Sequence, residues 1–153
     1  MAAENSKIVY GGEMMILITS GSTKYPVAFS TSAKLDLTLD IREISSKDSG
    51  IWKEKAAGKW DWKCDTEGLM SFGLSGTSVT LDVEDLYALM IARNAVTVTF
   101  GIVSGSTPSW VLDTSEKYFS GEAIITSFSM NAPDNDNATY SISLEGASAL
   151  TIT

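Results

Sequence analysis

The sequence contains no histidine among its 153 residues. This absence removes the side chain that most often acts as a general acid or base and that most often binds transition metals. Carboxylates and lysine remain available for catalysis in principle, yet the composition argues against an enzyme. The chain also has a single cysteine, Cys64, so it forms no internal disulfide. One thiol of this kind fits a reducing compartment.

The sequence also lacks long apolar runs and any excess of positive charge. Its apolar runs, such as residues 14–18, are far shorter than the about 20 residues that a membrane-spanning helix needs. Residues 1–7 contain no basic stretch followed by an apolar segment, so a secretory signal is not expected. The formal net charge is −8 and the sequence pI is near 4.4. This balance argues against general affinity for nucleic acid or for an anionic membrane surface.

What the chain does have is the composition of one globular domain. Hydrophobic residues make up 44% of the sequence and charged residues 20%, which allows a single buried core at this length. No linker or internal repeat divides the chain. We therefore expect one domain over residues 1–153, with residues 1–11 as a flexible N-terminal arm.

Hydrophobic residues mostly recur at every second position, which is the period of a half-buried β-strand. Leu35, Leu37, Leu39 and Ile41, for example, alternate with polar neighbours. Together with the other strand-like segments this pattern predicts about seven or eight strands. The other segments are residues 14–19, 25–30, 64–72, 96–103, 123–130 and 140–144.

One segment, residues 81–94, has the period of a helix. Asp82 is expected as its N-cap, with Asp85 three residues later in a variant of the capping box. Arg93 should lie at the negative end of the helix, and Asn94 should adopt the left-handed conformation that ends it. The apolar face should consist of Val83, Leu86, Leu89 and Met90. The predicted fold is therefore mostly β, a two-sheet β-sandwich or distorted barrel with one flanking α-helix.

A long connection, residues 45–63, interrupts the strand pattern. It contains five of the eleven basic residues, interleaved with acids, and two glycines, Gly50 and Gly58. A connection of this length inside a compact domain usually has a function. After Arg93 the chain has a single base, Lys117, so most of the positive charge lies in the N-terminal half. In an assembly this asymmetry would allow oppositely charged surfaces of neighbouring copies to meet.

Three tryptophans, Trp52, Trp60 and Trp62, are the strongest candidates for a functional cluster. If exposed on a β-sandwich, they could stack on sugars, as in a carbohydrate-binding module. The favoured alternative places Trp60 and Trp62, two residues apart on one strand face, in the core or at a subunit interface, where tryptophan is enriched. The neighbouring Asp61 and Asp65 are ordinary for a polar strand face and do not indicate a glycosidase.

Two other patterns have simple explanations. Residues 134–137 are rich in Asp and Asn but lack the central glycine and the closing glutamate of an EF-hand, so we expect a solvated hairpin turn. Cys64 has no histidine to act as its base, so we expect a small buried hydrophobic residue. The sequence thus predicts no catalytic, cofactor or metal site.

Several segments occur in an order that is typical of one family. Residues 47–52 are charged and contain a glycine, residues 58–62 read Gly-Lys-Trp-Asp-Trp, and residues 66–72 read Thr-Glu-Gly-Leu-Met-Ser-Phe. The expected helix and two closing segments, residues 121–128 and 137–147, follow in the same order. In this pattern the chain resembles the major tail proteins of bacteriophages, which build the tail tube. The resemblance covers residues 35–153.

The resemblance implies a tail-tube fold of two packed sheets with a flanking helix. Six subunits would form a ring, and stacked rings would form a tube with an acidic lumen that conducts DNA during ejection. In this family the long connection docks onto the next ring. The residues expected at the ring-stacking or subunit interface are Lys47, Asp48, Trp52, Lys53, Lys55, Lys59, Trp60 and Trp62.

The resemblance also implies the partners and the location. The partners would be other copies of the chain and the tape-measure and tail-end proteins, with DNA as transported cargo and without a membrane or a cofactor. The location would be the virion tail, after assembly in the host cytoplasm. Two alternatives remain open: the tube protein of a contractile injection or secretion system, which shares the fold, and a carbohydrate-binding β-sandwich module.

Overall fold

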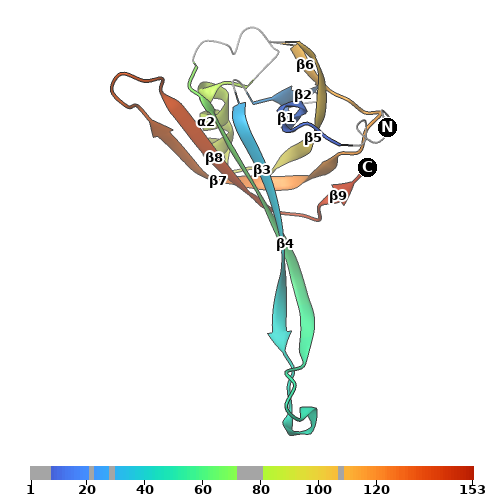
Figure 1. Cartoon of the computed structure of the whole chain (residues 1–153). Coiled ribbons are helices and arrows are strands. Elements are labelled where there is room, and N and C mark those ends of the chain that lie inside the picture. Colours follow the sequence, from blue (N-terminus) through green and yellow to red (C-terminus); the bar gives the residue numbers. More distant parts are fainter. Residues whose placement is uncertain (1–7, 21–22, 28–29, 72–80, 107–108) are drawn as a thin grey trace.

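The computed structural model describes residues 8–20, 23–27, 30–71, 81–106 and 109–153, and its strands form one antiparallel sheet (Figure 1). The order across the sheet is β2-β1-β5-β7-β8-β4-β3, with β6 beside β5 and β9 beside β7. The strands are β1 (Met14–Ser20), β2 (Thr23–Pro26), β3 (Ser30–Glu43), β4 (Lys55–Leu69), β5 (Val96–Ser106), β6 (Ser109–Leu112), β7 (Phe119–Asn131), β8 (Thr139–Gly146) and β9 (Thr151–Ile152). The helices are the 3-10 helices η1 (Gly11–Glu13) and η2 (Lys47–Ser49) and the α-helix α2 (Val83–Ala92).

The strands predicted from the period of two are present, and two of the expected boundaries are wrong. The expected strand at residues 25–30 is not continuous, because β2 ends at Pro26 and β3 begins at Ser30. Proline has no amide hydrogen for a ladder and is tolerated here because β2 is an edge strand. The strand expected at residues 64–72 begins earlier, at Lys55, and ends at Leu69, while residue 72 lies outside the described part of the chain.

The core lies inside the curvature of this single sheet. Ile16 and Ile18 of β1 belong to the same buried cluster as Ile142 and Leu144 of β8, although three ladders separate these two strands. The sheet must therefore bend around its own core. The mostly-β class is confirmed, whereas the hydrogen bonds run through one sheet and do not divide it into two.

Helix α2 confirms the predicted N-terminus. The Asp82 side chain accepts a hydrogen bond from the Asp85 amide at 3.2 Å, and the Asp85 side chain accepts one from the Asp82 amide at 3.3 Å. Val83 and Leu86 are buried in the core, and Leu89 and Met90 pack partly buried against it. The predicted C-terminus is wrong by one residue, because Arg93 rather than Asn94 adopts the left-handed conformation, with φ 60°.

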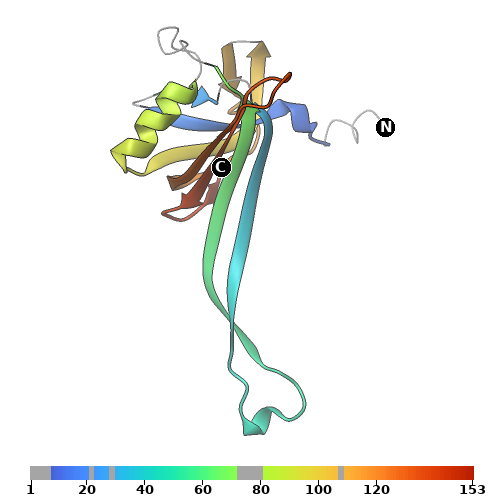
Figure 2. The same ribbon diagram turned by 90° about the vertical axis from the view of Figure 1, so that its left-hand side faces the viewer.

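Strands β3 and β4 form a long hairpin that projects from the body of the molecule (Figures 1 and 2). The expected long connection is therefore mostly strand in its second half: only residues 44–54 form a loop, and β4 begins at Lys55. A bulge between Leu39 and Ile41 shifts the register of the hairpin. Gly58 lies at this bulge, where a Cβ atom would come within 2.8 Å of the Asp40 carbonyl oxygen.

The turn and arm predictions have different outcomes. Residues 132–138 connect β7 to β8, and Asn135 has the left-handed φ of 60° that asparagine tolerates, so the predicted hairpin turn is confirmed. Of the expected N-terminal arm, residues 1–7 lie outside the described part of the chain. Ile8, Val9 and Tyr10 are described and are exposed.

Candidate functional site: the hairpin and the polar face of the sheet

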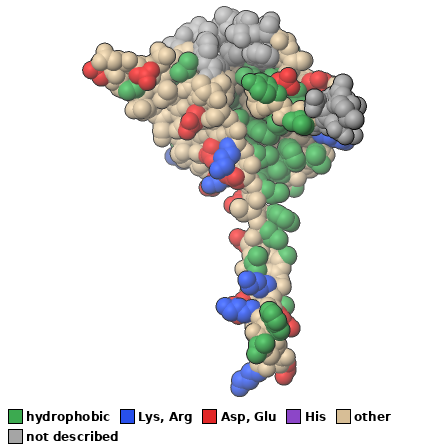
Figure 3. Space-filling model, in the orientation of Figure 1, with side chains coloured by type: hydrophobic (Ala, Val, Ile, Leu, Met, Phe, Trp, Pro, Cys, Tyr) green, Lys and Arg blue, Asp and Glu red, His purple; other side chains and the backbone are tan. Residues whose placement is uncertain are grey.

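One face of the β3–β4 hairpin is apolar, and this apolar face continues along the projecting part of the hairpin, where the body of the molecule does not cover it. Leu37 pairs with Trp62, Leu39 with Trp60, and Ile41 with Ala57, so these side chains share one face. Leu37, Ile41 and Trp60 are 52%, 62% and 65% exposed. Figure 3 shows hydrophobic side chains continuing from the body along one side of the hairpin. This surface, residues 37, 39, 41, 57 and 60, is called the apolar hairpin face below.

The tip of the hairpin carries the most exposed large apolar residues. Ile51 is 94% exposed and Trp52 is 77% exposed. They follow the single turn of η2, which begins with a capping box between Ser46 and Ser49, and Gly50 then turns the chain with φ 68°. A defined turn therefore presents Ile51 and Trp52 to the outside, and the tip is a locally structured element.

Trp62 anchors the hairpin to the body. It is only 5% exposed, and its indole N–H donates a hydrogen bond to the Ser148 carbonyl oxygen at 2.7 Å. Two glycines give its ring room, because a Cβ atom on Gly121 or Gly146 would collide with the indole. The sequence left open whether Trp60 and Trp62 belong to the core or to an interface. The structure places Trp62 in the core and leaves Trp60 exposed, so the two rings do not form one open platform for a sugar.

A groove of about 520 Å³ lies where the hairpin leaves the body. Trp60 and Leu37 line it on the hairpin side, and Leu150 lines it on the side of the C-terminal segment. This groove extends the apolar hairpin face into the body. Leu37 and Ile41 were not expected at the surface from the sequence, because they alternate with polar residues in the same way as Leu35, which packs partly buried against the core.

Charge is unevenly distributed between the hairpin and the rest of the chain. Residues 42–63 contain six bases and four acids, a net charge of +2, whereas the remaining residues contain five bases and fifteen acids, a net charge of −10. Residues 42–63 are called the distal segment. The one ion pair within the described residues joins Lys34 and Asp36 at 3.3 Å and lies outside the distal segment. The predicted Lys47, Asp48, Lys53, Lys55 and Lys59 all lie in the distal segment and are exposed.

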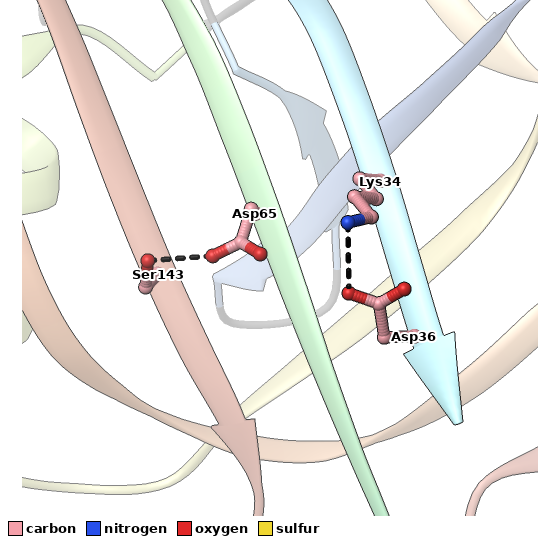
Figure 4. Close-up of polar contacts among 4 residues, drawn as sticks. All are labelled: Lys34, Asp36, Asp65 and Ser143. Carbon is pink, nitrogen blue, oxygen red and sulfur yellow. Dashed lines mark hydrogen bonds and ion pairs between the residues drawn. The ribbon is translucent and has the colours of Figure 1, made fainter. Parts of the chain in front are cut away.

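The opposite face of the same strands is polar. Lys34 of β3 makes the ion pair with Asp36, and the Ser143 hydroxyl of β8 donates to the Asp65 carboxylate of β4 at 2.6 Å (Figure 4). The register places these residues on the side of the sheet that faces away from the core. The side chains of this polar face are Lys34, Asp36, Asp61, Lys63, Asp65, Glu67, Glu122, Ser141, Ser143 and Glu145. Carboxylates outnumber lysines there, so the polar face is acidic.

Cys64 lies on the core side of β4, one residue from Asp65. It is buried, and burial together with the charges of Asp65 and Asp36 raises the pKa of its thiol to about 12. A thiol with so high a pKa is neutral and unreactive at physiological pH. The prediction of a small buried hydrophobic residue is confirmed.

The comparison with known families decides what this architecture belongs to. Residues 9–152 match the family described as phage tail tube protein. The chain belongs to this family. No curated protein matches the chain in sequence. The resemblance inferred from the order of sequence segments is thus confirmed over nearly the whole length.

Solved structures of tail tubes share the fold of this family member. A chain from the tail of an empty gene transfer agent particle, with C6 symmetry, matches with a TM-score of 0.73 and 16% identity over 95% of this chain and 99% of that chain. The SPP1 tail tube matches with a TM-score of 0.68 and 11% identity over 95% and 79% of the two chains. A chain from the baseplate of the anti-feeding prophage matches with a TM-score of 0.57 and 11% identity over 92% and 90%.

Membership of a structural family confirms the expectation of a non-enzymatic building block. Among the described residues, no cluster of Cys, Asp and Glu is placed to bind a metal ion. No helix in the described part of the chain is long and apolar enough to cross a membrane.

Proposed function

We propose that six copies of this chain form a ring and that the rings stack into the tube of a virion tail. The projecting β3–β4 hairpin is the observation that carries this proposal. A two-stranded hairpin is marginally stable by itself, and this one leaves an apolar face uncovered. A second copy that packs against the apolar hairpin face would remove it from water.

The edges of the sheet support closure into a ring. β2 and β3 are the two outer strands of the sheet, and β3 has 14 residues, far longer than the about 5–6 residues of an average strand. A long open edge pairs readily with another chain. Cyclic symmetry satisfies both edges of every copy, and the C6 tail with the same fold supports a ring of six.

The polar face of the sheet suits the lumen. Glu122 and Glu145 on it are exposed, and the face has more carboxylates than lysines. An acidic wall repels the phosphates of DNA, so DNA would pass as cargo without binding. The ring would then place the apolar hairpin face away from the lumen, toward neighbouring subunits.

The hairpin residues form the proposed stacking interface. Trp52 at the tip and Trp60 on the apolar hairpin face would be its aromatic anchors, because exposed tryptophans of this kind dominate interface energetics. Trp62 would act indirectly by fixing the hairpin to the body. The charged residues of the interface would be Lys47, Asp48, Lys53, Lys55 and Lys59.

The remaining partners follow from the shape of a stacked tube. Its two ends would expose different surfaces, which tail-end proteins would cover, and the resemblance to tail-tube proteins implies a tape-measure protein as a further partner. The single reduced cysteine fits assembly in the bacterial cytoplasm. The tube of a contractile injection system is the second candidate, because the anti-feeding prophage chain has the same fold.

Shortening the hairpin tests the proposed function. Glu43 and Lys55 are paired, so residues 44–54 can be replaced by Asn-Gly, which closes a two-residue turn. We expect this variant and Trp52→Ala to fold with unchanged circular dichroism but to form no tubes by electron microscopy. A deletion of residues 56–59 would be a less suitable test, because these residues belong to β4, where Ala56 and Ala57 pair with β3.

Tyr87→Ala is the matched control, because Tyr87 is an aromatic residue of α2 that is 59% exposed and lies outside the hairpin. It should leave tube formation unchanged. Normal tubes from both the shortened hairpin and Trp52→Ala would overturn the assignment of the hairpin to the stacking interface.

A further inference from the structure

The distal part of the hairpin, residues 42–63, carries positively charged side chains that form no ion pair with the described residues. Its bases include Lys47 and Lys53 at the tip, and neither lies within 4.0 Å of a carboxylate among the described residues. Ile51 and Trp52 lie between them in sequence and are exposed. The tip therefore combines apolar side chains with unpaired positive charge, and a surface that receives it should be apolar and acidic.

A small groove lies at the other end of the sheet, and its mostly polar lining includes two large apolar side chains and one acid. It has a volume of about 210 Å³, and Met130, Tyr140 and Glu67 are among the residues that line it. The volume is smaller than the about 300 Å³ at which small-molecule sites begin, so the groove suits a single side chain. Beside it, the β7–β8 turn exposes Asp134 and Asp136. This region, the groove and the turn, is called the acidic end below.

The hairpin tip and the acidic end lie at opposite ends of the molecule. Both views place the β7–β8 turn on the side of the body that is remote from the tip (Figures 1 and 2). The groove is formed where β4 and β7 end and where β3 and β8 begin, which is the end of these strands away from the hairpin tip. A contact between two different ends repeats in one direction and builds a filament of stacked copies.

We infer that the hairpin tip of one copy docks on the acidic end of a second copy in the next ring. This inference rests on the proposed function and names the surface that receives the hairpin. Trp52 or Ile51 enters the groove beside Met130, while Lys47 and Lys53 approach Asp134 and Asp136. The larger groove is lined by Leu37 and Trp60 of the hairpin itself, so it belongs to the end of the molecule that carries the hairpin and not to the opposite end.

A charge swap tests the contact. The hairpin reversal combines Lys47→Glu with Lys53→Glu, and the acidic-end reversal combines Asp134→Lys with Asp136→Lys. The critical concentration for tube formation is measured by light scattering and electron microscopy. We expect each reversal to raise it by about tenfold or more, because like charges then meet. We expect the critical concentration of the variant with all four substitutions to be within about threefold of that of the unmodified chain, because opposite charges meet again.

Matched controls separate this contact from the effect of net charge. Arg93→Glu with Lys117→Glu changes the net charge as the hairpin reversal does, and Glu13→Lys with Glu116→Lys changes it as the acidic-end reversal does. All four positions lie outside both surfaces. Each control should change the critical concentration by less than about threefold, because its charges do not face a partner charge.

The Asp136 side chain accepts a hydrogen bond from the Asn137 amide at 2.8 Å, so circular dichroism must show that the reversed variant is folded. Should it unfold, Asp134→Asn with Asp136→Asn keeps an acceptor in the turn and should still raise the critical concentration, by about threefold. Unchanged assembly of the acidic-end variants, or a folded four-site variant that stays defective, would overturn the inference. If one of these two results is obtained while the shortened hairpin still blocks assembly, the proposed function stands, and only the assignment of the acidic end as the receiving surface is wrong.

Discussion

The indole N–H of Trp62 donates a hydrogen bond to the Ser148 carbonyl oxygen at 2.7 Å, and this bond joins the base of the hairpin to the C-terminal segment. Residue 148 follows β8 and precedes β9, which pairs with β7. The hairpin is thus held at its base by a contact far away in sequence. The direction in which the tip points depends on how the Trp62 ring is packed.

A methyl group at Gly146 should disturb this packing. A Cβ atom there would collide with the indole of Trp62, and a buried ring has little space to move. We expect Gly146→Ala to lower the free energy of unfolding by about 1–3 kcal/mol, as overpacked cores do. Chemical denaturation measures this change.

Gly11→Ala is the control for this prediction, because a Cβ atom at Gly11 meets nothing within 4 Å. It should change the free energy of unfolding by less than about 0.5 kcal/mol. Equal stability of the two alanine variants would show that the Trp62 ring has room that the structure does not indicate.

The Cys64 thiol should make stability depend on pH in the alkaline range. The ordinary pKa of 9.0 applies to the unfolded chain, whereas burial raises the pKa in the folded protein to about 12. Below pH 9 the thiol is neutral in both states and contributes no pH dependence. Between pH 9 and about 12 only the unfolded chain loses the proton, so the free energy of unfolding falls by about 1.4 kcal/mol per pH unit.

Cys64→Ala isolates this contribution. Every other titratable group is common to both chains, so its effect cancels in the difference. The unmodified chain should therefore lose stability relative to Cys64→Ala as the pH rises from 8 to 10 in denaturant titrations. Parallel pH profiles for the two chains would contradict a buried neutral thiol.

The alternation of apolar residues predicted most of the strands because one face of each strand packs against the core. Ile142 and Leu144 of β8, for example, alternate with Ser143 and Glu145 in sequence and in burial. The start of α2 was predictable for a similar local reason, since the side chains of Asp82 and Asp85 each accept a hydrogen bond from the other's backbone amide, three residues away. Signals of this kind need no knowledge of distant contacts.

The length of the hairpin was not predictable in this way. Residues 55–59 show no alternation of apolar and polar residues, and they belong to a strand because residues 55–57 and Trp60 pair with β3. The different environments of Trp60 and Trp62 also depend on distant residues. Both rings lie on one strand face, but only Trp62 meets Gly121 and Gly146, which the fold brings from β7 and β8. The local sequence alone therefore does not distinguish Trp60 from Trp62.

The assignment of the polar face to the lumen predicts how tubes interact with DNA. Glu122 of β7 and Glu145 of β8 are exposed on this face and contribute to its negative charge. The double variant Glu122→Lys with Glu145→Lys makes each subunit more positive by about 4 charges and a ring of six by about 24. A lumen wall that repels DNA phosphates would then attract them. We expect these tubes to assemble and to retain DNA, whereas tubes of the unmodified chain do not.

Glu13→Lys with Glu116→Lys makes the same change in net charge away from the polar face and serves as the control. Retention is measured by sedimenting preformed tubes with short double-stranded DNA at rising salt, because binding through phosphates weakens steeply with ionic strength. DNA inside a lumen should also be protected from nuclease, unlike DNA bound to the outer surface. Equal retention by the two variants, without nuclease protection, would place the polar face on the outside of the tube.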